Sequence, residues 1–296
     1  MGTPTSIIRP TQLPELELVC PTNIDDLFKS LKGGAKPLAG GTDLLLQASN
    51  QGQPQKLAWI GNIESLHNLT EDGGQWRVGA GISLGELIRN ATFRHAAPAI
   101  VDAAQLVGSV QIRNQATLLG NICSASPAGD TLPALLVHEA EVEIAESPSL
   151  PLHDFLIAPG QTALAPGKIL LSVSLRGLQA NEMSCYRRHS ERKALDLAFA
   201  SVAIRLTFED DGCTVANARL ALGAVGPTAM LAKQATESIV GQPLTKESIT
   251  SCATIAAETC NPVSDFRASA DYRRQLIRVL VGDVITEIDR RVQLLS

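Results

Sequence analysis

The sequence predicts a mixed α+β fold made of two or three folding units. At 296 residues the chain is longer than one average domain. Strand-like and helix-like patterns alternate through the first 60 residues, which is typical of a small α/β unit. Nearer the C-terminus, two apolar runs flank the turn Asp210-Asp211-Gly212, which indicates a β-hairpin, and a long amphipathic helix follows.

The composition fits a globular chain with an aliphatic core. Hydrophobic residues make up 45% of the sequence and charged residues 19%, whereas aromatic residues make up only 3%. The net charge of −5 argues against a nucleic-acid partner, which would need a basic face. Because there is no run of 18 apolar residues and no signal-like N-terminus, we expect no membrane span and a cytoplasmic location.

The patterns in the N-terminal half alternate strand and helix. In residues 1–60 we expect strands at 17–20, 35–39 and 56–60, with helices at 23–31 and from residue 42. In residues 61–178 we expect strands at 75–79, 141–144 and 168–175, with helices at 83–90, 98–106 and 131–138.

The boundary before the C-terminal part, residues 179–296, lies within the segment 176–183. This part contains the expected hairpin, with strands at 197–208 and 214–224, and helices at 228–239, 246–258 and 269–294. The last helix carries a broad apolar face that includes Leu276, Leu280, Val284 and Ile288, and we expect this face to be core rather than a partner groove.

A glycine bend at residues 38–43, Leu-Ala-Gly-Gly-Thr-Asp, joins an expected strand to an expected helix. Two adjacent glycines let the backbone turn with its N–H groups free, and Thr42 or Asp43 can cap the helix. Free amides beside a helix N-terminus can bind a phosphate or pyrophosphate. The alternative is a tight turn with a capped helix and no ligand.

A second segment, residues 108–130, is rich in Gly, Ser, Asn and Thr and almost free of acidic charge. It has too little periodicity for an ordinary helix or an exposed strand, so we expect a long loop. Such loops in compact domains are usually functional or mobile. Short polar groups on a closely approaching backbone suit a cofactor, and a plain surface loop is the alternative.

These residues resemble the flavin subunits of molybdenum hydroxylases, the family of xanthine dehydrogenase and carbon monoxide dehydrogenase. Residues 39–43 are similar to the family's first FAD loop, and residues 111–130 to its second. Arg192 with Asp196, the run 265–267 and the run 272–274 match later landmarks, so the resemblance spans about residues 17 to 290.

The resemblance implies a two-part FAD-binding domain of the vanillyl-alcohol-oxidase or PCMH type, in residues 1–60 and 61–178. A smaller α/β domain like the C-terminal domain of the CO dehydrogenase flavoprotein would occupy residues 179–296. FAD would lie extended between the first two parts.

The resemblance also implies cofactor contacts for this chain. Residues 37–44 would wrap the pyrophosphate, and Thr117, Gly120 and Asn121 would contact it or the ribityl chain. Asp130 would bind on the ribose or adenine side, while Leu170 and Arg188 would touch the flavin ring, where a guanidinium favours the anionic reduced flavin. The implied FAD-binding residues are Pro37, Leu38, Ala39, Gly40, Gly41, Thr42, Asp43, Leu44, Val107, Thr117, Gly120, Asn121, Asp130, Leu170 and Arg188.

Three positions leave alternatives open. Leu119 stands where the family usually has a glycine, so its side chain must point away from the cofactor or the loop must shift. Val107 stands where some relatives have an aromatic residue, so stacking on the flavin ring would be weaker or supplied by another part of the protein. Arg188 could instead belong to a surface basic cluster with Arg187, Arg192 and Lys193.

Catalytic and metal-binding patterns are absent from the sequence. It has no HExxH motif, no recognisable triad and no CxxC, and its five histidines and six cysteines are scattered. We therefore predict no catalytic residue, iron–sulfur cluster or zinc in this chain, because a flavin would itself carry the electron chemistry.

The function that the resemblance implies is an FAD-containing oxidoreductase subunit, xanthine dehydrogenase-like and active only with partners. A molybdopterin subunit would oxidise the substrate, a [2Fe–2S] subunit would pass electrons on, and this chain would deliver them to NAD+ or another acceptor. The alternatives are a non-catalytic FAD-binding scaffold or assembly protein, a stand-alone flavin oxidase, and a nucleotide-binding protein that uses the first loop alone.

Overall fold

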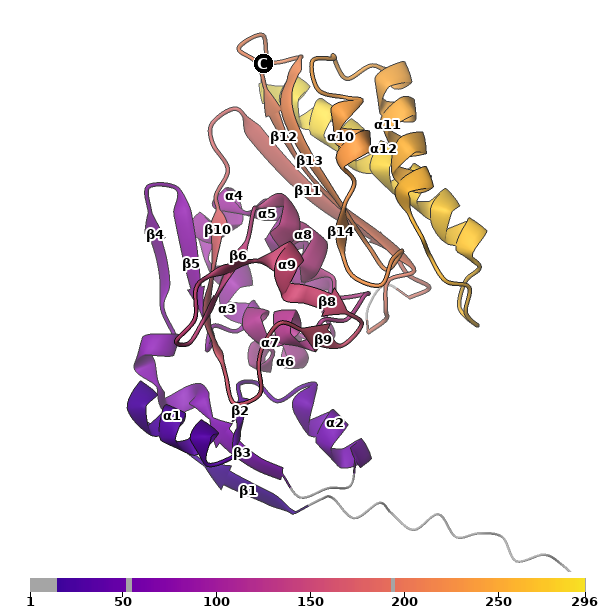
Figure 1. Ribbon diagram of the computed structural model, residues 1–296. Coiled ribbons are helices and arrows are strands. Elements are labelled where there is room, and N and C mark those ends of the chain that lie inside the picture. Colours follow the sequence, from indigo (N-terminus) through magenta and orange to yellow (C-terminus); the bar gives the residue numbers. More distant parts are fainter. Residues whose placement is uncertain (1–14, 52–54, 193–194, 296) are drawn as a thin grey trace, which may run out of the picture.

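The structure, a computed structural model, describes residues 15–51, 55–192 and 195–295. Figure 1 shows an N-terminal part and a C-terminal part at opposite ends, with a middle part between them. Residues 1–14 of the expected first part lie outside the described residues. The expected domain limits at residues 60 and 178 remain predictions.

The N-terminal part is a small parallel sheet with one helix in each connection. Its strand order is β1 (Leu16–Val19), β3 (Gln55–Trp59), β2 (Lys36–Leu38), and the connections contain α1 (Ile24–Lys32) and α2 (Leu44–Gln51). Asn23 caps α1 by accepting a hydrogen bond from the N–H of Asp26 at 2.9 Å. The expected α/β unit is confirmed, and the glycine bend lies between β2 and α2.

The middle part is an antiparallel sheet with helices. The sheet has the order β4 (Leu69–Asp72), β5 (Gln75–Gly79), β10 (Leu170–Arg176), β6 (Glu141–Ile144), β7 (Leu150–Pro151). The α-helices are α3 (Leu84–Arg89), α4 (Ala91–Ala96), α5 (Pro98–Leu106), α6 (Val110–Gln115), α7 (Leu118–Ser124), α8 (Thr131–Val137) and α9 (Leu152–Phe155). The remaining elements are the pair β8 (Leu156–Ala158) and β9 (Gln161–Thr162) and the 3-10 turns η1 (Ile60–Asn62) and η2 (Glu64–Leu66).

The expectation of a long loop at residues 108–130 is wrong. The segment contains the helices α6 and α7, of six and seven residues. Each begins at a capping side chain, because the hydroxyls of Ser109 and Thr117 accept hydrogen bonds from the N–H groups of Ile112 and Gly120. Helices of two turns or fewer are too short for an apolar period to be seen in the sequence.

The C-terminal part is an antiparallel sheet covered on one face by helices (Figure 1). The strands are β11 (Glu182–His189), β12 (Ala200–Phe208), β13 (Val215–Gly223) and β14 (Met230–Leu231), and the helices are α10 (Lys233–Glu237), α11 (Lys246–Thr259) and α12 (Ala270–Leu295). The hairpin β12–β13 and the long last helix are confirmed. The expected helix at 228–239 is wrong in its first turn, because Met230 and Leu231 pair with β13 instead.

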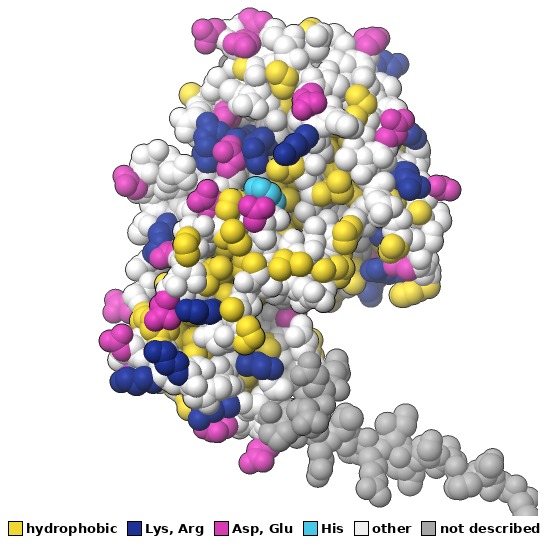
Figure 2. Space-filling view, in the orientation of Figure 1, with side chains coloured by type: hydrophobic (Ala, Val, Ile, Leu, Met, Phe, Trp, Pro, Cys, Tyr) yellow, Lys and Arg dark blue, Asp and Glu magenta, His cyan; other side chains and the backbone are white. Residues whose placement is uncertain are grey.

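Two apolar cores stabilise these parts. The first extends through the N-terminal and middle parts, and the second lies between the C-terminal sheet and its helices. Leu276, Leu280, Val284 and Ile288 are all buried in the second core, so the apolar face of α12 is core, as predicted. On the face in Figure 2, Lys and Arg side chains lie interspersed with Asp and Glu.

His138 joins the middle part to the C-terminal sheet. It is fully buried, with Nδ1 2.8 Å from the carbonyl oxygen of Arg176 and Nε2 3.0 Å from Oγ of Ser184. Burial lowers the pKa of His138 to about 4, although the hydrogen bond to the Arg176 carbonyl opposes this shift. The imidazole is therefore neutral near pH 7.

His138 should make the protein less stable in mild acid. In the unfolded chain its pKa returns to about 6.5, so between pH 6.5 and 4 only the unfolded state binds the proton. The free energy of unfolding should fall by about 3 kcal/mol over this range, measured by urea unfolding. His138→Gln should remove this contribution, whereas His153→Gln, at an exposed histidine, should keep it. Identical pH profiles for wild type and His138→Gln would contradict the assignment.

Candidate cofactor site

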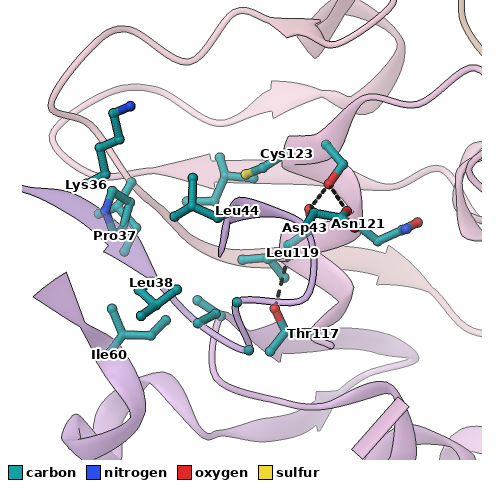
Figure 3. Close-up of a pocket in the computed structure, with 18 of the residues that line it drawn as sticks. Lys36, Pro37, Leu38, Asp43, Leu44, Ile60, Thr117, Leu119, Asn121 and Cys123 are labelled. Carbon is teal, nitrogen blue, oxygen red and sulfur yellow. Dashed lines mark hydrogen bonds between the residues drawn. The ribbon is translucent and has the colours of Figure 1, made fainter. Parts of the chain in front are cut away.

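A cavity of about 420 Å³ lies between the N-terminal and middle parts (Figure 3). Its walls come from three stretches of chain that are distant in sequence, namely residues 36–44, residues 116–124 and residues 164–170. The volume is within the range usual for sites of small molecules and cofactors.

Gly40 brings the glycine bend into contact with the end of α6, in the second predicted segment. A Cβ atom placed on Gly40 would lie 1.8 Å from the carbonyl oxygen of Gln115, so only glycine permits this approach of two backbones. Gly41 has a φ of +71°, the left-handed conformation that also favours glycine. The glycine bend and the second segment therefore lie against each other in the wall of one cavity.

Side-chain hydrogen bonds fix the same walls. The hydroxyl of Ser124 donates to the carboxylate of Asp43 at 2.5 Å, and so joins the end of α7 to the start of α2. Oγ1 of Thr117 accepts a hydrogen bond from the N–H of Gly120 at 3.0 Å. Figure 3 shows Asp43 and Thr117 on the two sides of the glycine bend. The cavity wall is thus braced on both sides before any ligand binds.

All of the predicted contact residues except Asp130 and Arg188 line the cavity. Residues 37–44, Thr117, Gly120 and Asn121 form the polar part of its walls, and Val107 and Leu170 contribute apolar surface. The described lining residues include no aromatic side chain, which agrees with the weaker ring stacking expected from Val107.

Asp130 and Arg188 contact each other behind the cavity wall. Nη1 of Arg188 lies 2.5 Å from one carboxylate oxygen of Asp130, and the hydroxyl of Tyr186 donates to the other at 2.6 Å. Next to Asp130, the Thr131 hydroxyl donates to the side-chain oxygen of the cavity residue Asn121 at 2.6 Å. Burial raises the pKa of Asp130, although the hydrogen bonds from Tyr186 and Arg188 oppose this.

This contact does not fit separate positions of the two residues at the adenine and ring ends of one extended dinucleotide. The FAD contacts expected for Asp130 and Arg188 stay predictions. The alternative of a surface basic cluster is wrong for Arg188, whose side chain is 3% exposed. Arg187 and Arg192 are more exposed, at 44% and 70%, and Lys193 lies outside the described residues.

Several lining residues were not identified from the sequence. The segment 164–170 carries no chemical signature, and only the turn Ala165-Pro166-Gly167 indicates a loop there. Leu119 lines the cavity and is only 3% exposed, so it does not turn out to solvent. The other additional lining residues are Lys36, Gln47, Ile60, Ala80, Ile112, Ala116, Cys123 and Ser124.

The chemistry of the lining favours binding over acid–base catalysis. Its charged residues are Lys36, Asp43 and Lys168, and no histidine or glutamate is among the described lining residues. Cys123 contributes an exposed thiol to the lining. Within the described residues, no group of three or more His, Cys, Asp or Glu could hold a metal, and no helix is long and apolar enough to cross a bilayer.

The lining fits a dinucleotide diphosphate. The backbone at Gly40 and Gly41 has no side chain to keep a phosphate away from its N–H groups. Lys36 and Lys168 add positive charge, and apolar residues such as Leu38 and Ile60 provide surface for rings.

Comparisons with known proteins agree with this site. Residues 12–175 match the family described as the FAD binding domain in molybdopterin dehydrogenase, and residues 185–288 match the CO dehydrogenase flavoprotein C-terminal domain. The xanthine dehydrogenase FAD-binding subunit of Escherichia coli O157:H7 is 28% identical over 86% of this chain and 88% of its own length. The carbon monoxide dehydrogenase medium chain of Hydrogenophaga pseudoflava is 28% identical over 90% of this chain and 95% of its own length.

Solved structures share the fold. Carbon monoxide dehydrogenase from Hydrogenophaga pseudoflava superimposes with a TM-score of 0.86 at 26% identity, covering 92% of this chain and 96% of that one. Quinoline 2-oxidoreductase from Pseudomonas putida 86 superimposes with a TM-score of 0.88 at 24% identity, covering 95% of this chain and 99% of that one. At this identity the match shows the fold alone. Because the first family match covers more than half of the chain, this protein belongs to the molybdenum hydroxylase family as an FAD-binding medium subunit.

Proposed function

We propose that this chain binds FAD in the cavity between its N-terminal and middle parts and transfers electrons from a [2Fe–2S] partner subunit to NAD+ or another acceptor. When bound, the flavin supplies the redox chemistry. One observation carries the proposal. The backbone at Gly40 lies against the carbonyl of Gln115, so the two segments expected to bind FAD form the wall of a single cavity.

In this proposal the chain binds and orients FAD. Backbone N–H groups of residues 38–44 would hold the diphosphate, and Thr117, Gly120 and Asn121 would hold it from the other side. Pro37 has no N–H and would only line the seat. Val107 and Leu170 pack against the rings. Asp130 and Arg188 act from behind the wall, by holding the segment that carries Asn121.

The partners and the location belong to the same proposal. The medium-chain and FAD-subunit names of the relatives support a molybdopterin-binding large subunit and a [2Fe–2S] small subunit. These relatives are named for different substrates, including xanthine, carbon monoxide and nicotinate, so a xanthine-like activity is one choice among several for the complex. Six free cysteines support a cytoplasmic location.

Reduction of bound flavin by the partners tests electron transfer. The complex, purified with its subunits, should contain about one FAD per copy of this chain, and substrate should bleach the absorbance near 450 nm. Adding NAD+ or an artificial acceptor should restore it. Bound FAD that substrate never reduces would support the scaffold alternative, and reduction of the isolated chain by substrate would support a stand-alone oxidase.

Ser124→Ala should weaken FAD binding without unfolding the protein. The substitution removes the hydrogen bond that joins α7 to Asp43 in the cavity wall, a loss of about 1 kcal/mol. The dissociation constant of FAD should rise about fivefold, measured by flavin fluorescence. Ser174→Ala, at an exposed serine of β10 outside the cavity, is the control and should bind FAD as the wild type does. Equal affinities for both variants would exclude a role for this hydrogen bond.

A further inference from the structure

A second polar site lies on the face of the C-terminal sheet that is turned toward α5 and α8. Here Arg176, Arg205 and Arg219 lie with Glu139 and Glu182, and we call these five residues the arginine cluster. None of them lines the cofactor cavity. Figure 2 shows Lys and Arg side chains gathered, with carboxylates among them, where the C-terminal sheet lies near the β4–β5 hairpin.

In the arginine cluster, the carboxylate of Glu182 already has several hydrogen-bond donors. Glu182 is 2% exposed in its side chain and accepts hydrogen bonds from Nη1 of Arg176, Oγ1 of Thr207 and the N–H of Gln179, each at 2.9 Å. Although burial opposes ionisation, these bonds lower the pKa of Glu182. Its charge therefore balances that of Arg176.

The other two arginines share a single carboxylate. Arg205 and Arg219 are directly opposite each other on β12 and β13, a pairing of like charges that destabilises a sheet. Nη2 of Arg205 donates to the Glu139 carboxylate, whereas Arg219 forms no ion pair with any described residue. Its one side-chain hydrogen bond goes from Nη2 to the carbonyl oxygen of Leu136, at 3.3 Å.

Two buried nitrogen atoms of this pair have no hydrogen-bond acceptor in the described part of the chain. They are Nη1 of Arg205, whose side chain is 5% exposed, and Nε of Arg219. Burial lowers the pKa of Arg219, and repulsion from Arg205 adds to this against the attraction of Glu139. Three guanidinium groups against two carboxylates leave one positive charge in excess. Arg219, which has no carboxylate of its own among the described residues, is half-buried, so part of its guanidinium faces solvent.

We infer that the arginine cluster binds a phosphate-type oxyanion, which pairs with Arg219 and Arg205. Guanidinium groups bind phosphate oxygens through paired N–H donors, and two of them on adjacent strands can hold one tetrahedral anion. Glu139 is 44% exposed in its side chain and Arg219 is half-buried, so this side of the cluster is open to solvent, and an anion bound at Arg219 would compensate the excess charge. This site is separate from the FAD site and does not depend on the proposed electron transfer.

Phosphate titration of the full-length protein tests this inference. The protein is kept saturated with FAD, so that added phosphate does not report on the cofactor seat, and chloride holds the ionic strength constant. Inorganic phosphate should raise the unfolding temperature, by about 2 °C for each tenfold increase above its dissociation constant. A parallel series with adenosine monophosphate distinguishes a nucleotide phosphate from the free ion, since only the fitting source should produce the rise.

Variants of Arg219 test whether the phosphate-dependent rise in unfolding temperature arises at the arginine cluster. Arg219→Gln should abolish the phosphate-dependent rise, and Arg219→Lys, which keeps the charge but loses the paired donors, should weaken phosphate binding at least about tenfold. Arg278→Gln removes the same charge from an exposed position on α12 and should keep the full response. The inference is overturned if wild type shows no rise beyond the chloride control, or if Arg219→Gln responds as wild type does, which would mean that ordered water satisfies these nitrogens.

Discussion

Gly40→Ala should nearly abolish FAD binding while the protein still folds. The new Cβ would lie 1.8 Å from the carbonyl oxygen of Gln115, and neither backbone can move aside without separating the two bends. Both halves of the diphosphate seat would then be displaced, and we expect the dissociation constant of FAD to rise roughly 100-fold, equivalent to about 3 kcal/mol. Flavin fluorescence titration measures this, and circular dichroism verifies the fold.

Gly282→Ala is the matched control for this substitution. Gly282 lies within α12, and a Cβ there would meet no atom within 4 Å, so FAD affinity should be unchanged. Stability should stay the same or increase slightly, because alanine favours a helix more than glycine does. Tight FAD binding by Gly40→Ala would mean that the two bends need not touch to form the site.

Asp130→Ala should destabilise the protein strongly. It would leave the guanidinium of Arg188 buried without a counter-charge and the hydroxyl of Tyr186 without its acceptor. Breaking a buried pair from one side costs about 3–5 kcal/mol, and the urea midpoint should fall accordingly. The cofactor should also bind more weakly, because the neighbouring Thr131 holds Asn121 in the cavity wall.

A double variant and a surface control test whether the loss of stability comes from the unpaired charge of Arg188. Replacing both partners, with Asp130→Leu and Arg188→Met, should recover much of the lost stability, since no charge is then left buried. Asp271→Ala removes an exposed partner of Arg274 and should have little effect. If Asp130→Ala is as stable as wild type, the contact between the middle part and β11 does not contribute to the fold.

The cavity was predictable where its residues have a distinctive local chemistry. Gly40 and Gly41 are recognisable because only glycine permits close backbone approach and a positive φ. Thr117 was expected in the site through the family resemblance of its segment, and its hydroxyl caps α7. The apolar segment 164–170 has no such signal, since its place in the lining is decided by tertiary packing. The same holds for Leu119.

The hydrogen-bond partners of Asp130 could not be predicted from the sequence around it, because they lie far along the chain. The resemblance implies a ligand contact for Asp130, but in the structure its carboxylate accepts hydrogen bonds from Tyr186 and Arg188, more than 50 residues later. The strand that carries both, β11, was not predicted as a strand. Its polar residues face the middle part rather than solvent, so the usual alternation of apolar and polar side chains is obscured.

The thiol of Cys123 bears on how the protein withstands oxidants. Cys123 lines the cavity wall and is exposed. A cofactor seated against that wall would cover the sulfur, and the thiol would then be shielded from peroxides that convert cysteine to a sulfenic acid. Occupation of the cavity would thus preserve the chemical form of its own lining.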